Sequence, residues 1–237
     1  MKKQILTVLA ALMLTSTAYA GSIGFGGQLS YANIDASGSE TEVGTATKSL
    51  SDSEVTKGNA SHDGAIIASI YAEYNTDFLE RGDGNSFTIG ASLVPISAEV
   101  SESDLKRSDA AGGDVSTEAD AGERSAQAEL EDLRVFYAEI PVMGGFYVRG
   151  GMAQVDVITT ESFSSTQGIT PSNYGNKTID GYNYGLGYKG ILPNGLQYKV
   201  SYQQTDFDSF SLTSNSGNKV SADIDTQELV FSAGFRF

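Results

Sequence analysis

The 237-residue sequence contains no cysteine, no tryptophan and a single histidine, His62. Without cysteine there can be no disulfide bond, thiolate metal site, cysteine nucleophile or acylated amino-terminal cysteine. One histidine excludes a multi-histidine metal site, and we predict no catalytic, cofactor or metal site. Lysine and arginine number 15 against 30 aspartates and glutamates, a net charge of −15. Because nucleic-acid phosphates bind lysine and arginine, this balance argues against a nucleic-acid partner.

Long hydrophobic runs are also scarce, and the one apolar stretch lies within residues 1–20, behind two lysines. Ala18 and Ala20 are small residues at the two positions that a signal peptidase reads. We therefore predict a signal peptide over residues 1–20, cleaved before Gly21, and one domain over residues 21–237. A membrane-anchoring helix would need about 20 apolar residues.

Instead of such runs the sequence has alternation. Residues 229–237 place an apolar side chain at every second position and finish on Phe237. Period two indicates a strand with one apolar face. Seven more segments alternate in the same way, with apolar residues on one phase and glycine, polar or charged residues on the other. They are about 21–33, 63–75, 86–98, 130–140, 145–158, 178–189 and 195–206. For residues 130–140 the predicted outward phase is that of Leu133, Val135 and Tyr137.

The connections between these segments alternate in length. The short ones, 76–85, 141–145 and 190–194, hold turn residues such as Gly and Asn, whereas the long ones are polar: about 34–62, 99–129, 159–177 and 207–219. Outward aromatic residues gather at two levels around an aliphatic band, as expected of a barrel in a bilayer. Eight strands fit the even number of bacterial barrels. Ten strands remain an alternative because the connections are long.

This layout resembles the small eight-stranded outer-membrane β-barrel family of the OmpA/OmpX type, without a periplasmic domain. The alternating end with Phe231, Phe235 and Phe237 is similar to the assembly signal of such barrels. The resemblance implies an all-β, antiparallel up-and-down transmembrane barrel in a Gram-negative outer membrane. It also implies lipid and lipopolysaccharide as surroundings and the barrel-assembly machinery as a partner. A soluble periplasmic β-sandwich is the alternative fold.

The inward phase carries charges of both signs: Glu73, Arg134, Arg149, Lys199, Glu228 and Arg236. An eight-stranded barrel is only wide enough for side chains to fill it, and buried charges need partners. We predict that these residues form a salt-bridged plug. The alternative is a narrow, gated ion path in which Glu73 or Glu228 exchanges arginine partners.

Three further features suggest chemistry less strongly. Residues 185–190 match a glycine-rich nucleotide motif, but no helix is expected after them, so inward glycines explain the match. Ser61 and His62 invite a hydrolase reading, yet neighbouring residues on a strand point to opposite faces. The acidic connections, 35–62 and 99–129, are explained by solvation, with divalent-cation bridging to lipopolysaccharide as the alternative.

We predict that the protein is not an enzyme but a structural or surface-interaction scaffold that presents long acidic loops. A small porin-like channel for ions or small solutes is the main alternative. A lipid-modifying enzyme is a third possibility and would require His62.

Overall fold

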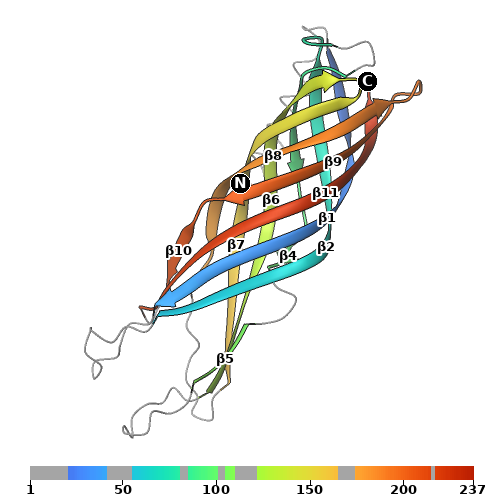
Figure 1. Ribbon diagram of the computed structural model, residues 1–237. Helices are drawn as coiled ribbons and strands as arrows, with labels where there is room; N and C mark the ends of the chain where they lie inside the picture. Colours follow the sequence, from blue (N-terminus) through green and yellow to red (C-terminus); the bar gives the residue numbers. More distant parts are fainter. Residues whose placement is uncertain are drawn as a thin grey trace, which may run out of the picture.

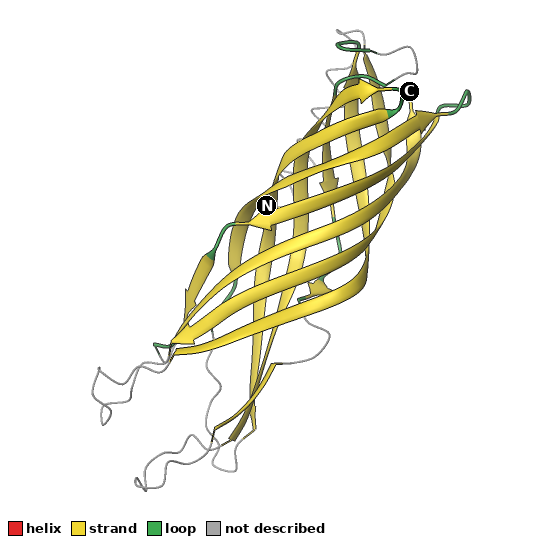
Figure 2. Ribbon diagram, viewed as in Figure 1, coloured by secondary structure: helices red, strands yellow, loops and turns green. Residues whose placement is uncertain are grey.

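The computed structural model describes residues 21–41, 55–80, 85–100, 105–109, 122–164, 174–214 and 217–237. All regular elements in these ranges are strands (Figures 1 and 2). Among the described residues there is no helix long and apolar enough to cross a membrane. The predicted signal peptide, with Ala18 and Ala20, lies outside the described residues, as do parts of the predicted acidic loops.

The strands are β1 (Gly21–Thr41), β2 (Val55–Thr76), β3 (Thr88–Leu93), β4 (Ala98–Glu99), β5 (Leu105–Asp109), β6 (Gly122–Met143), β7 (Phe146–Ser164), β8 (Lys177–Ile191), β9 (Leu196–Phe207), β10 (Phe210–Thr213) and β11 (Lys219–Arg236). Eight of them pair in the order β1-β2-β3-β6-β7-β8-β9-β11, and β11 pairs with β1 to close the ring. The strands β4 and β5 pair with β6, and β10 pairs with β11. The predicted fold class, an antiparallel up-and-down barrel, is confirmed with eight strands rather than ten.

The register shows that the ring is tilted. Directly paired residues lead once round the barrel from Asp35 through Asp225, Asp206, Tyr182, Met152, Phe136, Ala91 and Ala72 to Phe25. The circuit therefore returns to β1 ten residues before it started. Such a stagger is required for a sheet to close on itself and accompanies the strand tilt seen in Figure 1.

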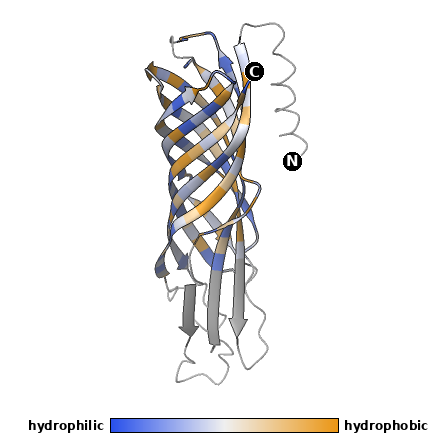
Figure 3. Ribbon diagram, turned by 90° about the vertical axis from the view of Figure 1, so that its right-hand side faces the viewer, coloured by the Kyte–Doolittle hydropathy of each residue, from blue (hydrophilic) through white to orange (hydrophobic). Residues whose placement is uncertain are grey.

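Alternation along the strands separates the two faces of the wall. On β8, Tyr182 and Leu186 are 63% and 59% exposed, whereas Asn183 and Lys189 between and beside them are buried. Figure 3 shows the same alternation of hydrophobic and hydrophilic residues along neighbouring strands. Since the exposed phase is apolar, the outer surface of the ring is hydrophobic.

The predicted phase of β6 is wrong. Val135 and Tyr137 are buried, while Phe136 and Ile140 are exposed to solvent or lipid. The physical reason is Glu139, which shares its phase with Tyr137 and would have faced lipid in the predicted arrangement. Turning that phase inward brings the carboxylate to Lys199 in the lumen.

The strands also extend further than predicted. Strand β1 continues to Thr41 and β2 starts at Val55, so most of the predicted 34–62 connection is a hairpin. Beyond the exposed Tyr31, Tyr182 and Tyr202, the polarity of the two faces reverses toward the long hairpins. This end, called the upper part here, is drawn at the bottom of Figure 1. There the buried, inward residues are apolar: Ala32, Ile34, Val155, Val157, Ile179 and Ile224. Aspartates such as Asp35 and Asp223 are exposed on the outside. This upper part of the barrel is therefore built like a water-soluble β-structure.

Candidate functional site in the barrel lumen

A continuous apolar band surrounds the barrel. One exposed residue from each strand of the ring illustrates it: Leu29, Ile70, Ile89, Phe136, Val148, Leu186, Val200 and Phe231, each between 40% and 59% exposed. Exposed apolar surface on this scale marks a membrane interface, and a closed ring satisfies every strand's backbone without water. The protein is a transmembrane β-barrel. Barrels of this type stand in Gram-negative outer membranes, which confirms the predicted location.

The centre of the lumen is occupied by Lys199 on β9. Its Nζ forms an ion pair with Glu73 on β2 and lies 2.9 Å from Oε1 of Glu139 on β6. The second oxygen of Glu139 lies 3.3 Å from Nζ of Lys189 on β8, and Nη1 of Arg149 on β7 lies 4.0 Å from Oε1. All five side chains are buried. Two carboxylates and three cations thus connect five strands of the ring.

Three tyrosine rings surround these charges. The ring centroids of Tyr71, Tyr147 and Tyr137 lie 5.4, 5.8 and 5.9 Å from Nζ of Lys199. The Arg149 guanidinium lies 3.5 Å from the centroid of Tyr137 and donates to Oδ1 of Asn183 at 2.9 Å. The aromatic faces stabilise the buried cations by cation–π contact.

Inward glycines make room for the tyrosines. A Cβ on Gly90 would lie 2.4 Å from Cζ of Tyr137, and one on Gly187 would lie 2.5 Å from the hydroxyl of Tyr147. Gly187 belongs to the glycine-rich run 185–190, which lies in β8 and leads to a turn rather than a helix. The nucleotide-like pattern is therefore a packing feature.

Polar side chains close the base of the lumen. Gln197 donates to Oε1 of Glu73, and the hydroxyl of Thr88 donates to Oδ1 of Asn75 at 2.9 Å. The Nδ2 of Asn85 donates to the carbonyl of Gly144 at 3.2 Å, which ties the β2–β3 connection to the β6–β7 turn. The lumen is thus filled from its base to the charged centre.

The structure brings together three of the six predicted lumen charges, Glu73, Arg149 and Lys199. Arg134 is buried but shares its phase with Phe136 rather than Tyr137, and its guanidinium pairs with Asp156 at 3.2 Å instead of joining the network around Lys199. The bulge after Glu131 sets this phase.

The other two predicted lumen charges lie away from the centre. Glu228 accepts a hydrogen bond from Thr226 at 3.4 Å, above the network, and Arg236 contacts Ser22 near the base. Sequence reasoning missed Glu139 because the phase of its strand was misread. It missed Lys189 because that residue lies at the strand end. Choosing the inward phase of each strand by the charge nearest its lower end, Glu139 in 130–140 and Lys189 in 178–189, would have found both.

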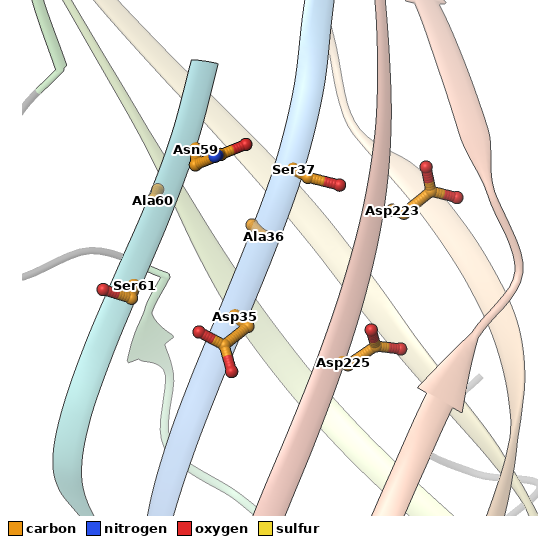
Figure 4. A pocket seen from close by; sticks show the side chains of 8 residues that line it. All are labelled: Asp35, Ala36, Ser37, Asn59, Ala60, Ser61, Asp223 and Asp225. Carbon is orange, nitrogen blue, oxygen red and sulfur yellow. The ribbon is translucent and has the colours of Figure 1, made fainter.

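The outer wall above the lipid band carries a row of aspartates. Asp35 pairs directly with Asp225, which pairs with Asp206 on the next strand. Asp35, Asp223 and Asp225 line an open pocket of about 330 Å³ between β2, β1 and β11 (Figure 4). Among the described residues, no three metal-ligating side chains are placed to hold an ion.

This crowding changes the acidity of one carboxyl group. Partial burial, together with the charges of Asp206, Asp223 and Asp35, raises the pKa of Asp225 above its ordinary value. A carboxyl whose pKa is raised by folding contributes stability below its unfolded pKa and loses it as the pH rises through the folded pKa.

We therefore expect Asp225→Asn to raise the free energy of unfolding at neutral pH by up to about 1 kcal/mol, the scale of a cross-strand pair. The gain should vanish below about pH 3.9, the ordinary aspartate pKa. Urea unfolding at both pH values tests this, with the exposed Asp63→Asn as control. An equal gain at both pH values would show that charge crowding is not its cause.

Ser61 and His62 do not face each other. Ser61 lines the outer pocket, whereas Nδ1 of His62 lies 3.1 Å from the carbonyl oxygen of Glu99. A nucleophile and its base need to be within hydrogen-bond reach, so these two residues do not form such a pair.

The sequence matches no protein-family model and no curated protein. Among solved structures it is similar to the outer membrane protein OprG from Pseudomonas aeruginosa, with 14% identity, a TM-score of 0.40 and coverage of 92% of this chain and 97% of that one. It is also similar to the outer membrane protease OmpT from Escherichia coli, with 11% identity, a TM-score of 0.44 and coverage of 94% and 99%. A third similar structure is the attachment invasion locus protein Ail of Yersinia pestis in complex with sucrose octasulfate. It has 13% identity, a TM-score of 0.33 and coverage of 89% of this chain and 99% of that one. The fold assignment rests on the strand pairing of this chain.

Proposed function

We propose that the protein is a closed scaffold of the outer membrane, which raises an acidic surface above the lipid and does not conduct ions. The observation that carries the proposal is the filling of the lumen. Polar contacts close its base, the ion network around Lys199 occupies its centre, and apolar residues such as Ile34, Val155 and Ile224 close its upper part. An ion would have to leave water and cross an apolar layer. The idealised solvation cost of moving an ion into a medium of low dielectric constant is about 20 kcal/mol.

The surface to be presented lies on the upper part of the barrel. Its outward side chains include six aspartates: Asp35, Asp156, Asp180, Asp206, Asp223 and Asp225. The hairpin of β1 and β2 continues above the lipid band to Thr41 and Val55, and that of β6 and β7 extends to Gly122 and Ser164. Paired hairpins, rather than loops alone, would carry the binding surface of such a scaffold.

Biogenesis forms a further part of the proposal. Residues 1–20 would be removed as a signal peptide, and the barrel-assembly machinery would recognise β11 through Phe231, Phe235 and Phe237. Phe235 and Phe237 are exposed, and the ring of Phe237 stacks on Phe25 at 5.6 Å between centroids. These side chains therefore lie at the strand pair that closes the ring, where assembly has to finish.

The alternative, a porin-like ion path, requires the lumen charges to change partners. Arg149 is held by Glu139, Asn183 and Tyr137 together, and Glu228 lies above it beside Thr226. An exchange would leave Glu139 with one partner fewer in a buried site. The closed scaffold is therefore the better reading.

Single-channel recording in a planar bilayer tests this choice. We expect no discrete steps from the mature chain when its folding is shown by faster migration of an unboiled sample on a gel. Reproducible steps from folded monomer would overturn the closed scaffold. A change of those steps in Glu73→Gln would then assign the path to the lumen.

A further inference from the structure

The three connections at the base of the barrel expose apolar side chains at their tips. Phe78 and Leu79 follow β2, Val142 and Met143 end β6 directly before the β6–β7 turn, and Leu192 follows β8. Their exposed fractions run from 43% for Leu192 to 68% for Met143. We call these five residues the turn foot. Turns that point into water normally carry polar residues, so their composition needs a cause.

Two of the three connections carry no charge and continue the lipid band, whereas Asp77 and Glu80 flank Phe78 and Leu79 in the third. Residues 140–146 and 191–196 contain no charged side chain. Met143 pairs with Phe146, whose ring lies 5.2 Å from that of Tyr188 between centroids. The ring of Phe78 lies 6.2 Å from that of Phe87. At the β6–β7 and β8–β9 connections no charged strip therefore separates the tips from the apolar wall.

The backbone at Leu79 is a second, independent observation. Its φ is 55°, in the left-handed region that favours glycine or asparagine. A leucine in this conformation is strained, and strain of this kind persists where the surroundings maintain it. The Leu79 side chain is nevertheless 44% exposed, and within the described residues it is not part of the buried core. An apolar environment outside the protein would account for keeping leucine there.

We propose that the turn foot is immersed in the inner leaflet, at the boundary between the phospholipid headgroups and the acyl chains. This inference rests on the barrel standing in a bilayer, as described above. The partner is phospholipid because the turn foot is continuous with the lipid-facing band and because the connections that hold Val142, Met143 and Leu192 carry no charge that would select a polar ligand. The base of the barrel is then a membrane anchor, and the polar surface available to partners lies at the opposite, acidic end.

The absence of tryptophan allows a direct test, because a single introduced tryptophan is the only one in the protein. We would fold Met143→Trp and Leu192→Trp into vesicles of phosphatidylcholine brominated either near the headgroup or near the chain end. We expect blue-shifted emission and at least threefold stronger quenching by the shallow bromines than Ser37→Trp shows. Ser37 lies on the outer wall beside Asp35, above the lipid band.

Leu186→Trp, in the middle of the band, separates this inference from the membrane placement itself. It must be quenched most strongly by the deep bromines; failure there would overturn both. If Leu186→Trp is quenched and the two turn variants behave like Ser37→Trp, the turn foot stands in water and the proposal is wrong. The turn foot would then be accessible to a periplasmic protein.

A tryptophan could draw a turn into the interface, so a second readout avoids aromatic residues. Because the chain has no cysteine, Met143→Cys takes a single nitroxide label. We expect its relaxation to respond more to oxygen than to a water-soluble nickel chelate. The reverse order would refute immersion.

Discussion

Replacing Glu139 by glutamine is expected to destabilise the barrel more than any other single change among the lumen charges. Its carboxylate contacts Lys199 at 2.9 Å, Lys189 at 3.3 Å and Arg149 at 4.0 Å. Loss of its charge leaves Lys199 with Glu73 alone and removes the carboxylate with which Lys189 and Arg149 pair in this network. Breaking a buried pair in this way typically costs about 3–5 kcal/mol. Urea unfolding of the barrel in lipid vesicles measures the loss.

Two variants make the result specific. Glu131→Gln removes a carboxylate from the same strand, but from an exposed position, and should change the free energy of unfolding by less than about 0.5 kcal/mol. Glu139→Gln combined with Lys189→Met removes one charge of each sign and should recover part of the loss. If Glu139→Gln unfolds at the same urea concentration as Glu131→Gln, the network does not stabilise the barrel.

The course of the strands could be predicted well from the sequence because lipid and lumen impose opposite chemistry on alternate residues. On β8, for example, Tyr182, Tyr184 and Leu186 form the apolar phase that predicted the strand, and all three are exposed in the structure. β6 was harder because both of its phases carry apolar residues: Val135 and Tyr137 on one, Phe136 and Ile140 on the other. The charge of Glu139, rather than hydrophobicity, decides between them.

The extent of the strands was harder to predict for a different reason. The prediction expected apolar residues to face outward, and this holds only within the lipid band. At Ile34 and Ile224 the apolar phase faces inward, because the wall outside is in water. Alternation continues through this level with its polarity reversed, so the segments looked like polar loops. Contacts between distant strands, such as that of Lys199 with Glu139, depend on the stagger of the closed ring, which no local pattern reveals.

Gly26→Ala is expected to impair closure of the ring. Gly26 on β1 pairs directly with Gly234 on β11, at the strand pair that joins the two ends of the sheet. A Cβ on Gly26 would lie 2.1 Å from the carbonyl oxygen of Ala233 and 2.6 Å from Cα of Gly234. These are backbone atoms of the closing strand and cannot move aside without breaking its hydrogen bonds. Overpacking typically costs about 1–3 kcal/mol, and we expect the upper end of this range here.

Gly27→Ala provides a matched control one residue along the same strand. Its Cβ would point outward, and its nearest neighbour would be the carbonyl oxygen of Ser69 at 3.9 Å, an ordinary contact. The added methyl group and the lost glycine flexibility are the same in both variants, so only the facing side differs. The fraction of each variant that migrates as folded barrel on an unboiled gel, followed against time after dilution into vesicles, compares them. Gly27→Ala should fold as the parent does, whereas Gly26→Ala should fold more slowly and in lower yield. Equal folding of the two would show that β1 and β11 do not approach as closely as the structure places them, and that closure tolerates a wider lumen.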